Sequence, residues 1–153
     1  MPTKKTSPPA SDLYLDNQLC HALYAASLAM TKTYRPLLAP LGLTYPQFVV
    51  LMALWQHRSL TAGALSQAVA LDSGTLVPLL RKLVARGLVQ RQRSEDDERS
   101  VIITLTPAGR ALQRRAQAIR AQVACSTQYS AAQCAAMTLQ LQSLRRTLAA
   151  PST

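Results

Sequence analysis

Apolar residues recur every three to four positions in three long stretches of the chain, which is the spacing of one face of an α-helix. These stretches run from about residue 12 to the mid-thirties, onward from Thr106, and onward from Ser130. They predict long helices towards both ends of the chain. The stripes consist of Leu15, Leu19, Leu23, Ala26 and Met30; of Leu112, Ala116, Ile119 and Val123; and of Cys134, Met137, Leu141, Leu144 and Leu148.

The middle of the chain has shorter stretches with the helical spacing of apolar residues, and residues typical of helix starts and ends mark their boundaries. Arg35-Pro36 and Pro40-Leu41-Gly42 are expected to end the first helix. Thr44-Tyr45-Pro46-Gln47, in which Thr44 and Gln47 fit a capping box, opens a second helix. Its stretch Phe48–Trp55 is apolar nearly all round and so expected to be buried. Two short helices follow at about 62–69, capped by Thr61, and at about 73–86, capped by Asp72 or Ser73 and ended by Gly87. Pro78 lies inside the latter, but the leucines on both sides of it share one stripe, so we expect one continuous helix.

The period then changes from 3.6 to 2, which predicts two strands, Val89–Arg93 and Ser100–Leu105, joined by a charged loop. The fold expected from this order is mainly α with a small β-hairpin wing. It is a winged helix-turn-helix, at about 44–106, flanked by helices at about 12–43 and 107–150. The flanking stripes have no second domain to cover them, so we expect these helices to form a homodimer.

Composition narrows the class of protein. The chain has 153 residues, which suits a single domain over 12–153, preceded by a Pro-, Ser- and Lys-rich tail at 1–11 expected to be disordered. A formal charge of +10 points to a polyanionic partner. The longest apolar run is far too short for a membrane span. No apolar stretch typical of a signal peptide follows Lys4 and Lys5, so we expect a cytoplasmic protein. Its three cysteines, an odd number for a secreted disulfide scaffold, are then expected to be free thiols.

Charge is concentrated where a helix-turn-helix protein would meet DNA. No acid lies between Asp72 and Glu95, and that window holds five cations, so we expect it to face phosphates. The first turns of the 73–86 helix would read bases in the major groove, and an arginine at the wing tip would enter the minor groove. The residues expected at this interface are Ser73, Thr75, Pro78, Arg81, Lys82, Arg91, Arg93, Asp97 and Arg99, with Asp97 orienting Arg99 through a charge-assisted pair and Ser73 also available as an N-cap.

The residues Asp97-Glu98-Arg99, Leu105-Thr106 and Gly109 resemble the signature of MarR-family winged-helix repressors. Further segments between Asp12 and Gly109 resemble the organic-hydroperoxide-sensing branch of that family, OhrR. These segments are Leu15–Cys20, Ala22–Tyr24, Tyr34–Leu38, Gly42–Gln47 and Leu71–Leu76. The chain departs from the branch at His21, because in this branch we associate the position after the cysteine with Phe.

The spacing around Cys20 suits a sensing thiol. Cys20, Tyr24, Ser27, Thr31 and Tyr34 form one polar stripe on the first helix, so Tyr24 can neighbour Cys20. Tyr34 is about 21 Å further along and can reach a thiol only across a dimer. The resemblance implies that Tyr34 and Tyr45 of one subunit hydrogen-bond the sensing cysteine of the other. Phenol donors favour the thiolate, which a peroxide converts to a sulfenic acid that a second thiol can trap.

The identity of the second thiol stays open between two cysteines. Cys134 lies on an apolar seam and is expected to be a small buried hydrophobe, whereas Cys125 lies off the seam near a helix end and is more accessible. The resemblance to two-cysteine members places the resolving thiol at Cys125, paired with Cys20 of the other subunit.

The sequence therefore predicts a redox-sensing repressor that is not an enzyme. The reduced homodimer would bind an inverted-repeat operator and leave it when an organic hydroperoxide oxidises Cys20. Three alternatives stay open: a repressor released by a non-covalent phenolic ligand, a thiol peroxidase using Cys20 and Cys125, and a non-specific architectural DNA binder. No cofactor is expected, and His21 and His57 form no metal-ligand set.

Overall fold

The computed structural model describes residues 10–97 and 99–150. The chain divides into two compact units, Met1–Tyr45 and Pro46–Thr153. Most of the tail predicted to be disordered, 1–9, lies outside the described residues, while Ala10 and Ser11 begin a 3-10 turn.

The first unit is built around one long helix. Two 3-10 turns, η1 (Ala10–Leu13) and η2 (Leu15–Asn17), precede α1 (Leu19–Leu38), and a third turn, η3 (Ala39–Leu41), follows it. The predicted start near Asp12 is therefore wrong. The Gln18 side-chain amide donates to the carbonyl oxygens of Asp12 and Tyr14, which favours turns over a continuous helix there.

Of the two signals predicted to end this helix, Arg35-Pro36 does not end it, whereas Pro40-Leu41-Gly42 does mark its end, since Pro40 and Leu41 lie in η3. Pro36 lies inside α1, where it removes one backbone hydrogen bond, and the helix continues to Leu38. Leu38 is completely buried and lies one turn beyond the buried Tyr34, so its burial offsets the missing bond.

The second unit contains the winged helix-turn-helix. It comprises α2 (Tyr45–His57), β1 (Ser59–Thr61), α3 (Ala62–Val69), α4 (Ser73–Ala85), β2 (Val89–Arg93) and β3 (Val101–Leu105). The helices lie where the sequence predicts them, and α4 runs through Pro78 without a break. The winged helix-turn-helix fold is therefore confirmed.

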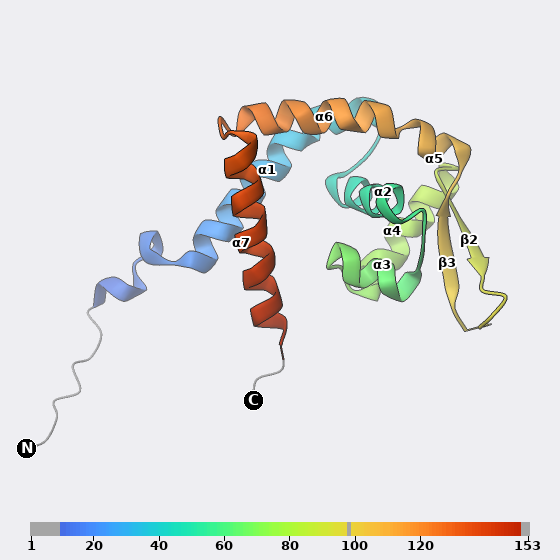
Figure 1. Ribbon diagram of the computed structural model, residues 1–153, viewed down its shortest axis with the longest axis horizontal. Coiled ribbons are helices and arrows are strands. Elements are labelled where there is room, and N and C mark those ends of the chain that lie inside the picture. Colours follow the sequence, from blue (N-terminus) through green and yellow to red (C-terminus); the bar gives the residue numbers. More distant parts are fainter. Residues whose placement is uncertain (1–9, 98, 151–153) are drawn as a thin grey trace, which may run out of the picture. The chain divides into compact units, whose positions relative to one another are not determined.

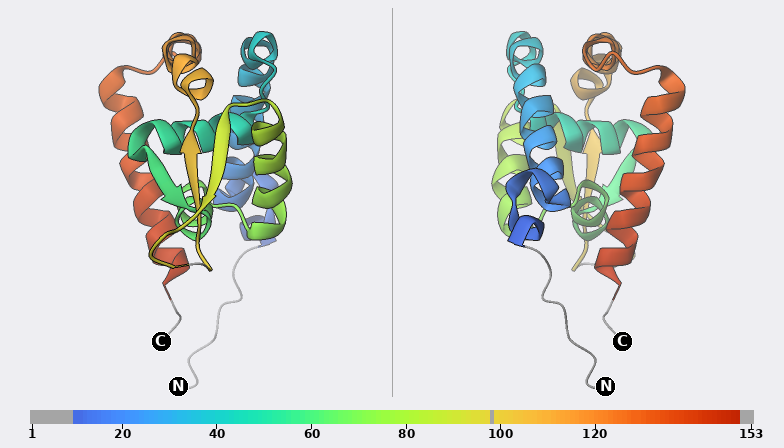
Figure 2. Two further views of the ribbon diagram at one scale, coloured as in Figure 1. Left: turned by 90° about the vertical axis from the view of Figure 1, so that its right-hand side faces the viewer. Right: turned by 90° about the vertical axis from the view of Figure 1, so that its left-hand side faces the viewer.

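The sheet has three strands and not the two that were predicted. Its order is β1-β3-β2, all antiparallel, with Leu60 opposite Ile103 and Arg91 opposite Ile103 on the other side (Figure 2). β1 is only three residues long, too short for an alternating pattern to be recognised.

The core of this unit joins the helices to the sheet. Leu54 of α2, Leu65 of α3, Leu83 of α4 and Ile103 of β3 are completely buried. Thr61 caps α3 by accepting a hydrogen bond from the Ala64 N–H. Because α4 is anchored by its leucine stripe, its opposite face is held out towards solvent.

The helix predicted after Thr106 is broken in two, α5 (Pro107–Ala111) and α6 (Gln113–Ser126). The indole N–H of Trp55 donates to the Gly109 carbonyl at 3.0 Å. A continuous helix would use that carbonyl for Gln113, so the tertiary contact accompanies the break at Leu112.

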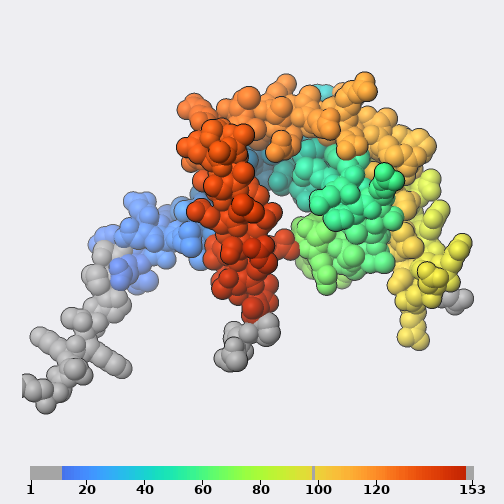
Figure 3. Space-filling view, viewed as in Figure 1, coloured from blue at the N-terminus to red at the C-terminus, as the bar shows by residue number. Residues whose placement is uncertain are grey.

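The last helix, α7 (Ala131–Ala149), begins with the predicted capping box of Ser130 and Gln133. None of its residues, all of them described, is buried in the single chain. The Arg145 guanidinium reaches across to the Gln67 carbonyl of α3 at 2.9 Å, a contact between red and green elements in Figure 3.

Within the described residues no single helix is long and apolar enough to cross a membrane. The stretch Leu19–Leu41 and the helix Tyr45–His57 reach the required length and apolar character only when taken together, across a break.

Candidate nucleic-acid interface and redox thiols

α4, the helix expected to read bases, presents an exposed face with polar side chains. Ser73, Thr75 and Pro78 are exposed in its first half, and Arg81 and Lys82 continue that face along its second half. The intervening leucines are buried in the core, so these five predicted residues lie on the exposed side of α4, the helix labelled in Figure 1.

The start of α4 is set by Asp72. Its carboxylate accepts hydrogen bonds from the backbone N–H of Thr75 at 2.8 Å and from the Thr75 hydroxyl at 3.3 Å. These bonds lower the pKa of Asp72 below its ordinary value. Asp72 is therefore the N-cap, and Ser73 is the first residue of the helix with its side chain exposed.

The wing carries three exposed arginines. Arg91 and Arg93 lie two positions apart on β2, and so on one face of that strand, while Arg99 lies in the turn that precedes β3. Asp97 accepts from the backbone N–H of Arg99 and from the Ser100 hydroxyl, each at 3.0 Å. The predicted pairing of Asp97 with Arg99 thus involves the backbone of Arg99: the carboxylate shapes the turn, and the guanidinium is exposed.

Cys20 is a free, exposed thiol in the first turn of α1. Tyr24, one turn further, is also exposed, with 64% of its surface accessible. Tyr34 is buried near the other end of the same helix. Because α1 is helical from Cys20 to Tyr34, the two side chains of one chain lie too far apart to touch, as their spacing predicts.

Tyr34 and Tyr45 form an aromatic pair that spacing alone did not reveal. Their ring centroids lie 5.0 Å apart, with the planes tilted by 45°. The Pro- and Gly-containing turn at 39–42, which ends with Gly42 in the left-handed region, reverses the chain between them and was the available signal. Burial raises the pKa of Tyr45, which keeps its phenol neutral and able to donate a hydrogen bond.

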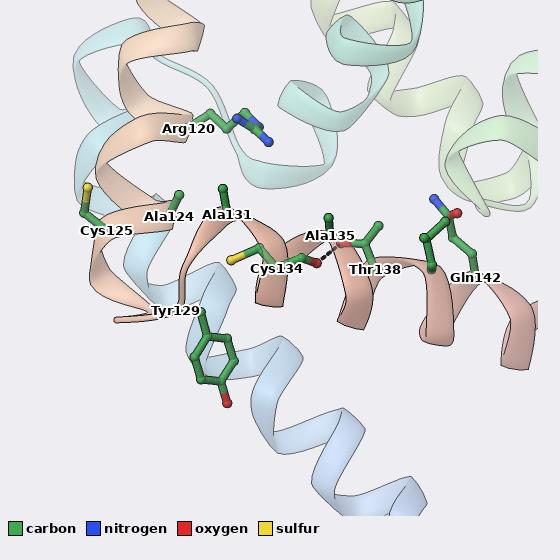
Figure 4. A pocket seen from close by; sticks show the side chains of 10 residues that line it. Arg120, Ala124, Cys125, Tyr129, Ala131, Cys134, Ala135, Thr138 and Gln142 are labelled. Atoms are coloured by element: carbon green, nitrogen blue, oxygen red, sulfur yellow. Dashed lines mark hydrogen bonds between the residues drawn. The ribbon is translucent and has the colours of Figure 1, made fainter.

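The other two thiols line one cavity at the junction of α6 and α7 (Figure 4). Cys125 is exposed, as its position off the α6 seam predicts, whereas Cys134 has intermediate exposure and is less buried in the single chain than expected. The Cys134 sulfur lies 3.8 Å from the Thr127 hydroxyl oxygen. The cavity has a volume of about 620 Å³.

Among the described residues no group of three or more His, Cys, Asp or Glu side chains is arranged to hold a metal ion.

Comparison with known proteins agrees with this arrangement. The family described as transcriptional regulator SarA/Rot matches residues 32–115, more than half of the chain. The organic hydroperoxide resistance transcriptional regulator of Bacillus subtilis is 51% identical over 102 residues, which cover 67% of this chain and 69% of that protein. The chain is a MarR-family transcriptional regulator of the organic-hydroperoxide branch. Because the relatives are regulators and not enzymes, the prediction that this chain is not an enzyme is confirmed.

Solved structures of regulators have the same fold. Reduced AbfR bound to DNA is 30% identical with a TM-score of 0.69, covering 89% of this chain and 96% of that one. Disulfide-formed AbfR is 31% identical, with a TM-score of 0.62 and coverage of 85% and 91%. BpsR of Bordetella bronchiseptica, whose DNA binding is regulated by 6-hydroxynicotinic acid, is 29% identical, with a TM-score of 0.75 and coverage of 84% and 98%.

Proposed function

We propose that this MarR-family regulator is a redox-sensing repressor. The reduced homodimer binds an inverted-repeat operator, and an organic hydroperoxide releases it by oxidising Cys20. The observation that carries the proposal is a free, exposed Cys20 in a chain that is 51% identical to an organic hydroperoxide resistance regulator. AbfR, a relative of similar fold, has been solved both reduced on DNA and in a disulfide form.

The exposed face of α4 and the wing would provide the DNA contacts. Ser73, Thr75 and Pro78 lie at the end of α4 that a helix-turn-helix inserts into the major groove. Arg81, Lys82, Arg91 and Arg93 would bind phosphates, and Arg99 would enter the minor groove beyond the wing. Asp97 would hold the turn that presents Arg99.

The helices at about 12–43 and 107–150 would form the dimer, with 44–106 as the DNA-binding region. Large apolar side chains on α1 and α7 are exposed in the single chain, among them Leu19 at 63% and Leu148 at 75%. A second copy would cover this surface and place two reading helices about one helical turn of DNA apart.

The tyrosines would activate the sensing thiol across the dimer. The Tyr34–Tyr45 pair supplies two neighbouring phenols, and we assign them to Cys20 of the other subunit, with Tyr24 beside Cys20 in its own helix. The peroxide would transfer one oxygen to the Cys20 sulfur and leave as the alcohol, and Cys125 would displace water from the sulfenic acid to form a disulfide. Oxidation that lowers operator affinity 100-fold corresponds to about 2.7 kcal/mol of coupling.

Retention on a candidate operator tests the proposal. A few equivalents of cumene hydroperoxide are expected to release the wild type, to leave Cys20→Ser bound, and to act reversibly once dithiothreitol is added. If both proteins stay bound or both dissociate, Cys20 is not the switch. An equal affinity for operator and random DNA at physiological salt would instead indicate an architectural DNA binder.

A non-covalent ligand is the second candidate, because BpsR, with a similar fold, is regulated by 6-hydroxynicotinic acid. A cavity of about 230 Å³ between α2 and α6, lined by Phe48, Met52 and Trp55, would suit a small aromatic molecule. Release of Cys20→Ser from the operator by a phenolic acid would favour this candidate.

A further inference from the structure

The α6–α7 junction brings two thiols to one cavity, although α7 is otherwise a surface helix. Cys125 is in the last turn of α6 and Cys134 is in the first turns of α7, nine positions later. Both are free, and both side chains lie at the end of the cavity nearest the interhelical turn (Figure 4). The cysteine assigned above to trap Cys20 therefore shares the lining of a cavity with a second thiol.

The cavity suits thiol chemistry. Its lining includes the guanidinium of Arg120 and no carboxylate, so an anionic sulfur meets no like charge there. Cys134 is partly shielded and in van der Waals reach of the Thr127 hydroxyl, whereas Cys125 is open to solvent. An incoming sulfur can therefore reach Cys125 first, with Cys134 in the lining of the same cavity.

The turn between the two cysteines is held by a few local bonds. The Thr127 hydroxyl donates to the Ala124 carbonyl at 2.7 Å and accepts from the Tyr129 N–H at 3.1 Å. Gln128 has a positive φ of 58°, which is unfavourable for a residue with a side chain. A disulfide requires α-carbons within about 7 Å, and this strained turn is where the backbone can adjust to close one between Cys125 and Cys134.

We propose that Cys125 and Cys134 form a second redox pair, which takes the disulfide over from Cys20. This inference rests on the proposed function for the first step, formation of the Cys20–Cys125 disulfide. The Cys134 thiolate then attacks the Cys125 sulfur, a new Cys125–Cys134 bond forms, and the bond to Cys20 breaks. Cys20 leaves as a thiolate and takes up a proton; no further oxidant is consumed in this exchange.

The exchange has two consequences. It returns Cys20 to its reduced form, so a second molecule of hydroperoxide can oxidise it while Cys125–Cys134 stays closed. It also moves the covalent bond to the α6–α7 junction, where it links the last turn of α6 to the first turn of α7. The final oxidised form then carries a disulfide within one chain.

Peptide mapping under non-reducing conditions, on samples alkylated at successive times after addition of cumene hydroperoxide, tests the exchange. The Cys20–Cys125 peptide is expected to rise first and fall as the Cys125–Cys134 peptide appears. Wild type is expected to consume about two oxidising equivalents per chain, against about one for Cys134→Ser. The control Ser126→Ala changes the side chain beside Cys125, keeps all three thiols, and should behave as wild type.

A second measurement separates this inference from the proposed function. The thiol oxidant diamide, applied to Cys20→Ser, should close a Cys125–Cys134 disulfide within one chain, because Cys20 is not needed for their approach. Failure of that bond to form overturns the inference even where hydroperoxide still releases wild type from DNA. A Cys20–Cys125 disulfide that persists in wild type, with only one equivalent of hydroperoxide consumed per chain, also overturns the inference. If hydroperoxide leaves Cys20 unoxidised, both the proposed function and the exchange are overturned.

Discussion

Gly109 of α5 lies against the backbone of Leu88, the residue just before β2. An added Cβ would overlap the carbonyl oxygen of Leu88 and lie 3.0 Å from a methyl carbon of Leu105. The Gly109 carbonyl also accepts the Trp55 indole N–H, so this residue joins α5, the sheet and α2. A side chain here would separate these elements.

Gly109→Ala is therefore expected to destabilise the protein by about 2 kcal/mol or more, because overpacking forces the backbone to move. The thermal midpoint should fall by several degrees in a calorimetric scan. Gly63→Ala is the matched control, since nothing lies within 4 Å of its added Cβ and it is helical, and it should stabilise by about 0.5–1 kcal/mol. Equal effects of the two substitutions would contradict the close approach at Gly109.

Tyr45 is half-buried beside Tyr34, and burial raises its pKa above the ordinary value of 10.0. In the folded state the phenol therefore holds its proton to higher pH than in the unfolded state. Its contribution to stability is complete below the ordinary pKa and is lost as pH rises through the folded pKa.

The free energy of unfolding of wild type should accordingly fall more steeply above pH 10 than that of Tyr45→Phe, measured by urea denaturation at several pH values. The same substitution removes a proposed donor to Cys20 of the other subunit, so cumene hydroperoxide should oxidise Cys20 about tenfold more slowly at pH 7. Parallel stability curves would show that this phenol does not titrate with unfolding, and an unchanged oxidation rate would remove Tyr45 from the thiol site.

The wing, formed by β2, β3 and the loop between them, differs from α4 in how its exposed side chains are held in place. α4 is anchored by four buried leucines and begins at the Asp72 cap, whereas the wing tip depends on the Asp97 hydrogen bonds to Arg99 and Ser100. A substitution at the wing tip is consequently expected to change the proposed DNA contacts of the wing without disturbing the helix-turn-helix.

Arg99→Ala should weaken operator binding about 10- to 100-fold and leave dimerisation unchanged, because it removes the proposed minor-groove contact. Arg93→Ala serves as the comparison: a lost phosphate contact should weaken binding to all sequences similarly and reduce the salt slope by about one. Titrations of both variants against operator and random DNA at several salt concentrations distinguish the two roles. Normal operator affinity in Arg99→Ala would remove the assignment of the wing.

The chain as a whole leaves apolar surface uncovered at both ends. In α7, Met137, Leu139 and Leu141 are exposed along with Leu148, although the sequence places most of them on one stripe. A single chain of this size would not keep such a surface in water, and a second copy is the proposed cover.

Leu141→Glu is expected to convert the dimer to a monomer in light scattering and to abolish operator binding, because it buries an unpaired charge in the proposed interface. Gln140→Glu introduces the same charge at the neighbouring polar position and should leave the dimer intact. Circular dichroism should show the same helix content for both. A dimeric Leu141→Glu would place the interface elsewhere.

Local signals were sufficient for much of this protein. The stripe of α4, the caps at Thr61, Asp72 and Ser130, and the alternation in β2 and β3 lie where the pattern predicts them, because each depends on neighbours within a turn or a strand. Of the stripe predicted after Thr106, Ala116, Ile119 and Val123 are buried in α6, and Leu112 lies at the break before it. The reading face of α4 follows from the same periodicity. The family signature likewise lies in short contiguous segments.

Contacts between distant residues decided the remainder. The third strand forms because the edge of β3 pairs with Ser59–Thr61. The break after α5 accompanies the hydrogen bond from the Trp55 indole N–H to the carbonyl of Gly109, 54 positions later in the chain. The Tyr34–Tyr45 pair and the cavity shared by Cys125 and Cys134 depend on how two turns reverse the chain. The sequence thus determines which reactive side chains the protein has, and the folded chain determines which of them meet. The physical reason is that tertiary packing, and not the hydrophobic periodicity of the sequence, sets which residues are close across a turn or a sheet.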